Sequence, residues 1–148
     1  MEFSYCDGGR FVAGYKGITG DCVVRAIAIV TGKPYQEVYD ALNILSKTEH
    51  IGKNKKDKSN SRIGIYRITF DKYLKSLGYQ WIPTMHIGTG CTVHLRSDEL
   101  PKGRLVVRVS RHMTAVIDGV IYDLNDCSRD GNRCVYGYYK KCFGNQIK

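Results

Sequence analysis

Three residues whose side chains together support nucleophilic acyl transfer stand at recognisable positions in the chain. Cys22 begins a run of apolar residues, and His112 and Asp123 lie on either side of the dipeptide Asp118-Gly119. A cysteine thiolate attacks a carbonyl carbon, an imidazole takes and returns the proton, and a carboxylate orients the imidazole. The residue types therefore suggest a thiol-dependent hydrolase or transferase that forms a covalent acyl intermediate.

The dipeptide Asp118-Gly119 predicts a two-residue hairpin turn between strands over residues 112–117 and 120–124. Side chains alternate between the two faces of a strand, so the pairing decides which of them share a face. We expect the imidazole to hydrogen-bond the carboxylate or the amide across the hairpin, which fixes its tautomer and stabilises its protonated form. The residues that share this face are His112, Thr114, Asp123 and Asn125.

The apolar run that begins at Cys22 has a single charge, Arg25, among its first nine residues, so we expect it to be buried nearly all round. Periodicity does not separate a buried strand from a buried helix, and the β-branched residues favour a strand. A capping aspartate at Asp21 and a glycine at Gly32 favour a helix instead, which we adopt. At the helix N-terminus, unpaired N–H groups and the helix dipole lower the pKa of a thiol and can stabilise an oxyanion.

The elements expected around these residues divide the chain into a helical part and a sheet part. Spacings of three and four between apolar residues predict helices over residues 35–45 and 65–77. Alternating or β-branched runs predict strands over 79–82, 104–110 and 135–139, besides the hairpin. Helices followed by an antiparallel meander indicate an α+β domain, with N-terminal helices packed on a C-terminal antiparallel sheet.

The composition is that of one globular domain spanning residues 1–148. Hydrophobic residues make up 43% of the chain and charged residues 25%, with only three prolines, which excludes a disordered, collagen-like or coiled-coil chain. No apolar stretch approaches the ~18 residues of a membrane span, and the first residues lack the apolar region of a signal peptide. We therefore expect a cytoplasmic protein that does not associate with membranes.

The six cysteines contain no Cys-x-x-Cys pair, so no ribbon-type zinc site is predicted. Cys91 and His94 in Cys91-Thr-Val-His94 have the spacing of metal ligands, and Cys127 or Cys134 could complete a zinc site with them. The chain has no second closely spaced ligand pair to support such a site. A disulfide framework would need a secretory context, so most of these thiols are expected to be reduced and inert. Cys22 differs from the others only by its place at the start of a helix. No metal and no organic cofactor is expected.

The net charge of +9 is concentrated in two places, of which the larger is an exposed loop over residues 47–62 that separates the helical and sheet parts. Such a loop attracts polyanions, so an acidic protein partner or a nucleic acid is expected there if the loop binds at all. No helix-turn-helix, zinc-finger or RNA-recognition signature accompanies the charge. The basic side chains assigned to this surface are Lys53, Lys55, Lys56, Lys58 and Arg62.

Two segments give the chain a resemblance to papain-fold cysteine peptidases. Gly20-Asp-Cys-Val-Val-Arg-Ala, followed about ninety residues later by His112-Met-Thr-Ala-Val-Ile-Asp-Gly-Val-Ile-Tyr-Asp123, resembles the compact bacterial and phage peptidases related to those that trim double-glycine leaders. The resemblance implies a papain-like fold, in which a buried helix begins with the nucleophilic cysteine, and a histidine and an Asp or Asn follow on the sheet.

Carried over to this chain, the resemblance implies that Cys22 is the nucleophile, His112 the general base and acid, and Asp123 the orienting residue, with Asn125 as its alternative. The substrate would be a peptide or protein, cleaved or transferred at an amide, isopeptide or thioester bond. The family's glutamine, an oxyanion donor about six residues before the cysteine, is replaced here by Lys16, which leaves Lys16, Thr19 and backbone N–H groups as candidates. The alternative is a catalytically inactive relative that binds nucleic acid or protein through its basic surface.

Overall fold

The structure is a computed structural model that describes residues 1–17, 19–51 and 57–142. Within these residues three helices pack on a six-stranded mixed sheet. The helices are α1 (Cys22–Thr31), α2 (Tyr35–Ser46) and α3 (Arg67–Ser76). The strands are β1 (Glu2–Tyr5), β2 (Tyr79–Pro83), β3 (Arg104–Val109), β4 (His112–Ile117), β5 (Val120–Asp123) and β6 (Val135–Lys141).

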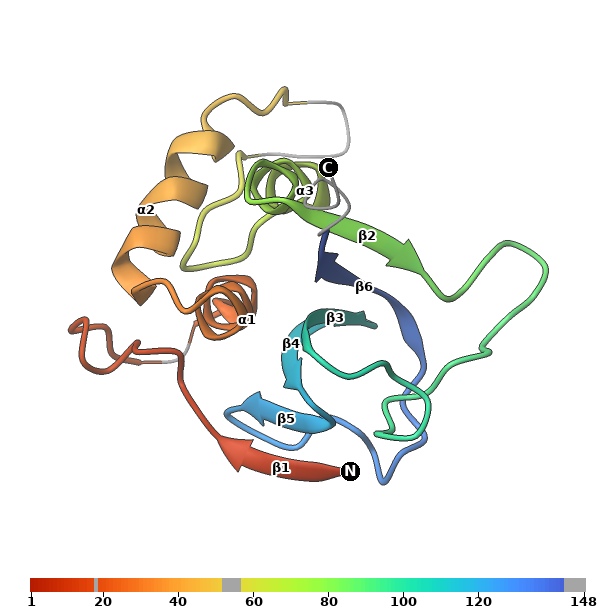
Figure 1. Cartoon of the computed structure of the whole chain (residues 1–148). Helices are drawn as coiled ribbons and strands as arrows, with labels where there is room; N and C mark the ends of the chain where they lie inside the picture. The colour runs from red at the N-terminus through yellow and green to blue at the C-terminus, as the bar shows by residue number, and fades with distance from the viewer. Residues whose placement is uncertain (18, 52–56, 143–148) are drawn as a thin grey trace, which may run out of the picture.

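The strands follow the order β1-β5-β4-β3-β6-β2 across the sheet (Figure 1). The α+β class expected from the sequence is thereby confirmed, with the three helices lying before all strands but one. None of the described helices is long and apolar enough to cross a membrane.

The first helix, α1, is the buried helix that the boundary residues predicted. Gly32 ends it with a φ of 74°, and its N–H donates to the Ala28 carbonyl at 2.9 Å. A residue without a Cβ adopts this left-handed conformation at little cost. The predicted side-chain cap is wrong, because the carboxylate of Asp21 makes no hydrogen bond to the backbone N–H groups of the first turn. It binds other side chains instead, so the first N–H groups of α1 have no side-chain cap.

The hairpin of β4 and β5 has the predicted register. Ile117 pairs with Val120, and Asp118-Gly119 adopt φ values of 48° and 80°. These positive values are the ones that a two-residue type I′ turn requires. Beyond the pair of Ala115 and Tyr122, the hydroxyl of Thr114 donates to Asp123 Oδ2 at 2.8 Å, which puts these two side chains on one face.

The strand β1 was not predicted, and it corrects the expected antiparallel sheet to a mixed one. It pairs in parallel with β5, with Tyr5 opposite Asp123. The N–H of Cys6 then donates to the carbonyl of Asp123 at 2.9 Å. Four residues show no clear alternation, and their partner strand lies far along the chain, so local pattern does not reveal the pairing. The N-terminal segment thus supports the end of β5.

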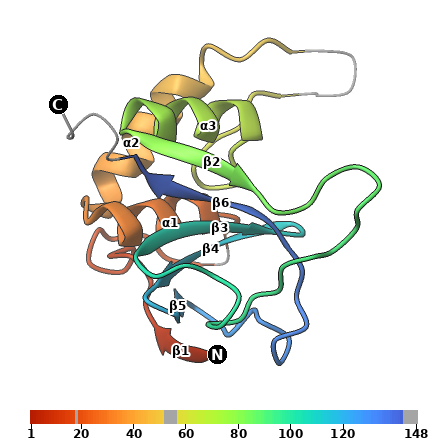
Figure 2. The ribbon, with the colours of Figure 1, turned by 45° about the vertical axis from the view of Figure 1, so that its right-hand side comes forward.

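The core has two apolar clusters that share the central strands. The larger one joins the helices to Val106, Met113, Ala115 and Tyr139 of the sheet. The smaller one joins Leu95, from the long connection between β2 and β3, to other residues of the same strands. Figure 2 shows the helices stacked over one side of the sheet and the long connection extending beyond β2.

A disulfide joins Cys91 of that connection to Cys134, just before β6, with their Cα atoms 5.8 Å apart. Two of the six cysteines therefore depart from the expectation that most of the thiols are reduced and inert. The sequence did not predict this disulfide bond, because its two cysteines are 43 positions apart and neither belongs to a closely spaced cysteine pair. The free cysteines of the described residues are Cys6, Cys22, Cys127 and Cys142.

Candidate functional site

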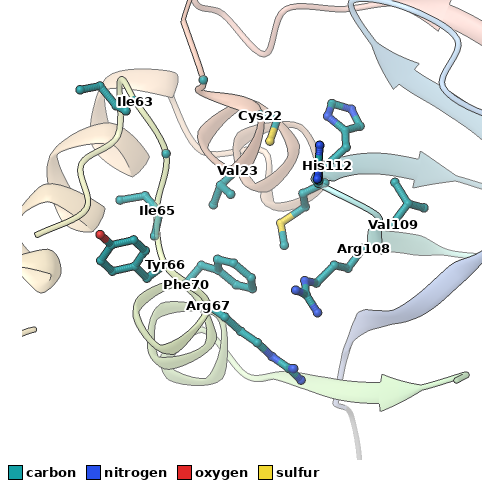
Figure 3. A pocket seen from close by; sticks show the side chains of 14 residues that line it. Cys22, Val23, Ile63, Ile65, Tyr66, Arg67, Phe70, Arg108, Val109 and His112 are labelled. Atoms are coloured by element: carbon teal, nitrogen blue, oxygen red, sulfur yellow. The ribbon is translucent and has the colours of Figure 1, made fainter. Parts of the chain in front are cut away.

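Cys22, His112 and Asp123 come together where the N-terminus of α1 meets the beginning of β4 and the end of β5. Cys22 and His112 line one cleft, with a volume of about 420 Å³, which is closed on its other side by residues 63–67. Figure 3 shows the Cys22 sulfur and the His112 imidazole as neighbours at the edge of this cleft. The residues proposed from the sequence to act together are therefore adjacent in space.

The imidazole of His112 is held by a buried carboxylate. Its Nε2 donates to Asp123 Oδ2 at 2.7 Å, and the Thr114 hydroxyl donates to the same oxygen at 2.8 Å. The N–H of Leu124 donates to Asp123 Oδ1 at 2.7 Å. Burial raises the pKa of Asp123, but the hydrogen bond and charge of His112 outweigh it and hold that pKa below its usual range. Asp123 thus remains ionised, and Nδ1 is the ring nitrogen left for another partner.

Arg25, one turn along α1 from the thiol, joins two buried carboxylates. It donates from Nη1 to Asp123 Oδ1 and from Nε to Asp21 Oδ1, each at 3.0 Å. The hydroxyl of Tyr35 donates to Asp21 Oδ2 at 2.6 Å. The carboxylate side chains of Asp21 and Asp123 are only 2% and 5% exposed, so each needs a cationic partner to remain charged. Arg25 therefore holds the helix that carries Cys22 against the strand that orients His112.

The thiol of Cys22 is shifted toward its reactive form. Burial raises the pKa of Cys22. The hydrogen bond and positive charge of His112, the N–H of Met113 and the charge of Arg25 lower this pKa by more than burial raises it. The net pKa lies below the ordinary value of a cysteine. The uncapped N-terminus of α1 favours the thiolate in the same direction.

The imidazole of His112 is shifted the opposite way. Burial lowers the pKa of His112, but hydrogen bonds with Asp123, Cys127 and Cys22, and the charge of Asp123, raise it to about 11. The pKa of the thiol is thus lowered and that of the imidazole is raised. A thiolate–imidazolium pair is therefore favoured at every pH between the two values, which is the state in which a cysteine attacks carbonyl carbon.

Gly20 allows two chain segments to meet beside Cys22. Its N–H donates to the carbonyl of Arg62 at 2.8 Å, and a Cβ at this position would lie 2.1 Å from the carbonyl oxygen of Ile63. Any side chain at residue 20 would push these segments apart. The wall of the cleft next to the thiol therefore depends on this glycine.

Two arginines on the far side of the cleft form no salt bridge with a described carboxylate, and Arg67 interacts electrostatically with Asp71 of its own helix. Arg67 of α3 lies over the Trp81 ring at 5.1 Å, and Arg108 of β3 lies over the Tyr136 ring at 5.5 Å. Burial and the charge of Arg67 both lower the pKa of Arg108. Within the described part of the chain, no carboxylate lies at salt-bridge distance from either guanidinium. Both line the cleft of Cys22 (Figure 3), which is therefore electropositive.

Three other residues expected at the site lie away from the reacting groups. Asn125 is exposed beyond the end of β5, so Asp123 alone of the two candidates contacts His112. Lys16 is exposed, and Thr19 hydrogen-bonds the carboxylate of Asp21. Neither Lys16 nor Thr19 lines the cleft. Of the oxyanion donors considered, the backbone N–H groups at the start of α1 are the ones adjacent to the thiol.

The basic loop is described only in part. Lys53, Lys55 and Lys56 lie outside the described residues. The Lys58 ammonium donates to the Lys47 carbonyl at 2.6 Å, and Arg62 Nη2 donates to the Lys16 carbonyl at 3.2 Å. Lys58 therefore binds the C-terminal cap of α2, and Arg62 binds the segment before α1, so these contacts bear on local structure.

A second thiol, Cys127, lies beside the imidazole. His112, Asp123 and Cys127 offer ligand atoms within 4.8 Å of one another. Asp123 Oδ2 already accepts three hydrogen bonds, from His112, Thr114 and Cys127, and Oδ1 lies 3.0 Å from the guanidinium of Arg25. A positive charge in contact with the carboxylate repels a divalent cation, so the contacts here favour an orienting role for Asp123.

The sequence contains a signal for the role of Arg25 in the site. A single arginine inside an otherwise apolar, buried helix requires a buried carboxylate partner. Two candidate partners are Asp21, which was predicted to cap the helix, and Asp123, which was predicted to orient His112. No sequence signal indicated that Cys127 lies beside the His112 imidazole, because this position depends on the path of the chain after β5.

Comparison of the chain with protein-family models, with curated proteins and with solved structures finds no match. The functional inference therefore rests on the side chains of the cleft and on their contacts.

Proposed function

We propose that this protein is a papain-like cysteine hydrolase or acyl transferase that acts on an amide, isopeptide or thioester bond. Cys22 is the nucleophile, His112 the general base and acid, and Asp123 the orienting carboxylate. The observation that carries the proposal is the 2.7 Å hydrogen bond from His112 to a buried, ionised Asp123, made by the same imidazole that lowers the pKa of Cys22. Arg25 is a positioning residue that fixes Asp123.

In the first half of the proposed cycle, the Cys22 thiolate attacks the carbonyl carbon of the substrate, and the C=O electron pair moves onto oxygen. The N–H groups at the start of α1, which the Asp21 side chain leaves uncapped, stabilise this oxyanion. The C–N or C–S bond then breaks as the imidazolium of His112 donates its Nδ1 proton to the leaving group. A thioester between Cys22 and the acyl group remains.

In the second half, water or an amine attacks the thioester carbonyl while the neutral His112 takes the proton of that nucleophile. The C–S bond breaks, and the Cys22 thiolate and the His112 imidazolium are restored together. Asp123 keeps its charge throughout and stabilises the imidazolium in both halves. No redox step and no external electron acceptor are needed.

Arg67 and Arg108, two of the three arginines that line the cleft, favour a substrate with negative charge on the side of the cleft that they occupy. Arg67 and Arg108 stack on aromatic rings that hold their guanidinium groups in place. Planar guanidinium groups bind carboxylates through two parallel hydrogen bonds. We therefore expect an acidic peptide segment to occupy the side of the cleft that faces α3 and β3.

A pair of electrophilic peptides tests the proposal. Two peptidyl vinyl sulfones that differ only in carrying Glu or Lys next to the reactive carbon are reacted with the protein, and the adducts are located by peptide mass spectrometry. The proposal predicts one adduct, on Cys22, that forms about 10-fold faster with the Glu probe, a difference of about 1.4 kcal/mol. Replacement of both Arg67 and Arg108 by Gln abolishes the difference between the probes.

Cys142→Ser is the matched control, because Cys142 is a free, exposed thiol that does not line the cleft of Cys22. It leaves the labelling of Cys22 unchanged. Labelling spread evenly over the free cysteines would contradict the hydrolase and favour the inactive binding module. Selective labelling of Cys22 without a preference between probes would contradict only the acidic substrate.

A further inference from the structure

A second cysteine–histidine–carboxylate group lies in the connection between β2 and β3, outside the cleft of Cys22. Cys91 and Cys134 form the disulfide, and His94 Nε2 lies 3.5 Å from the Cys91 sulfur. The two sulfurs and a ring nitrogen of His94 all lie within 4.8 Å of one another. Nothing in the proposed acyl-transfer cycle uses these three side chains.

The other ring nitrogen of His94 is held by a carboxylate. Its Nδ1 lies 3.2 Å from Glu99 Oε1, which also accepts the backbone N–H of His94 at 2.9 Å. A carboxylate at Nδ1 keeps the proton there and leaves Nε2 with its lone pair directed toward sulfur. This is the arrangement by which proteins orient a histidine that ligates a metal.

The backbone around the group is fixed by pairing between two segments. His94 and Cys134 are bridge partners, and Leu95 N–H donates to the Arg133 carbonyl at 2.8 Å. The side chain of Leu95 is fully buried, so its neighbour His94 points away from the apolar core. An isolated β-bridge next to the sheet therefore fixes the backbone of His94 and Cys134.

The distances fit a tetrahedral zinc ion. Zn–S bonds of about 2.3 Å and Zn–N bonds of about 2.0–2.1 Å, at tetrahedral angles, place sulfur and nitrogen about 3.6 Å apart. The observed separation between Cys91 Sγ and His94 Nε2 is 3.5 Å. Two thiolates and one imidazole are a donor set that selects zinc over the hard cations Mg²⁺ and Ca²⁺. Only the Cys134 sulfur has to move, from its bond with Cys91 to a ligand position.

We propose that Cys91, His94 and Cys134 form a redox-controlled Zn²⁺ site, which binds the ion when the disulfide is reduced, with Glu99 orienting His94. A dithiol reductant supplies two electrons and two protons, which gives two free thiols and an oxidised dithiol. Zinc then binds both sulfurs and His94 Nε2 and releases the two thiol protons. Three protein ligands leave a fourth position for water or another ligand. In a reducing compartment, where disulfides are not maintained, the metal would tether the connection to β6 in place of the S–S bond.

Cobalt provides the test, because Co²⁺ in a tetrahedral thiolate site has a sulfur-to-metal charge-transfer band in the near ultraviolet. The full chain, reduced with a phosphine that is then removed without oxygen, is titrated with Co²⁺ and back-titrated with Zn²⁺. One Co²⁺ binds per reduced chain with a thiolate band, zinc displaces it, and the oxidised chain binds none. Glu99→Gln keeps the band but weakens binding by about 10–100-fold.

His94→Ala and Cys134→Ser remove the tight site, whereas His112→Ala and Cys127→Ser leave it intact. Since His94→Ala retains the disulfide, circular dichroism of its oxidised form verifies that the variant is folded. A reduced chain that binds no Co²⁺, or a thiolate band that survives Cys134→Ser or disappears in Cys127→Ser, would overturn the proposal. These outcomes are independent of whether Cys22 catalyses acyl transfer.

Discussion

Two groups in this molecule contain the same residue types, a cysteine, a histidine and a carboxylate, yet their surroundings differ. At the N-terminus of α1, the side chain of the histidine's partner Asp123 is 5% exposed and is also bound by Arg25. In the connection between β2 and β3, the partner Glu99 is 25% exposed, and its cation Arg96 is 44% exposed. The difference between the groups is therefore the burial of the carboxylate and of the cation that accompanies it.

The comparison shows how surroundings direct the same side chains to different chemistry. A buried, ionised Asp123 keeps His112 protonated, and a helix N-terminus favours the thiolate of Cys22, which is the state that the proposed acyl transfer needs. In the second group, two sulfurs face one histidine whose Nε2 carries its lone pair toward them. That arrangement suits a shared metal ion or an S–S bond, and it provides no activated single thiol.

The largest effect on stability is expected from Arg25→Met, which removes the buried cation from the first group. The substitution removes the cation that two buried carboxylates share, and it leaves Asp21 with Arg10 and Tyr35, and Asp123 with His112. Breaking a buried pair on one side costs about 3–5 kcal/mol of unfolding free energy. Urea denaturation followed by circular dichroism measures this cost. Such a variant also loses the selective labelling of Cys22, because Asp123 no longer has a fixed position.

Lys33→Met is the matched control for Arg25→Met. Lys33 pairs with Glu37 at 3.0 Å on the exposed surface of the helical part. Exposed pairs of this kind contribute about 0–1 kcal/mol. Equal costs for the two substitutions would mean that the network of Arg25 has no special structural role.

A smaller effect on stability is expected from Cys134→Ser, which breaks the disulfide of the second group. The bond closes a loop with a sequence separation of 43 residues, and bonds of this kind contribute about 2–4 kcal/mol to the free energy of unfolding. Urea denaturation of the oxidised protein, with and without the substitution, measures the difference. Cys142→Ser, at an exposed and free thiol, changes the free energy by less than about 0.5 kcal/mol. A similar small change for Cys134→Ser would argue against a structural disulfide.

Much of the architecture followed from local sequence signals. Gly32 set the end of α1, and Asp118-Gly119 set the register of the hairpin, because each position needs a positive φ that glycine or aspartate tolerates. The adjacency of Thr114 and Asp123 then followed from alternation along the strands. These features depend on residues close together in the chain, where pattern and conformation are directly related.

The parts that the sequence did not predict depend on contacts between distant segments. The strand β1 pairs with β5 from the opposite end of the chain, and Cys91 bonds to Cys134 across a long connection. Asp21 looked like a helix cap, but its carboxylate binds Arg25 and Tyr35. Each outcome was decided by which side chains met in the folded core, and no local spacing encodes that.

The most direct test of the acyl-transfer proposal is the pH dependence of Cys22 alkylation by iodoacetamide, measured in the wild type and in His112→Ala. Since the pKa of Cys22 is lowered, its thiolate persists to lower pH and is lost only as the pH falls through that value. The wild type is therefore expected to react with an inflection below about 8.5, the pKa of an ordinary thiol. At pH 6, His112→Ala should slow the reaction of Cys22 by about 10–100-fold, because an ordinary thiol is mostly protonated there. The exposed Cys142 should react identically in both proteins, and a Cys22 profile that matches Cys142, or that His112→Ala does not change, would contradict the proposed nucleophile.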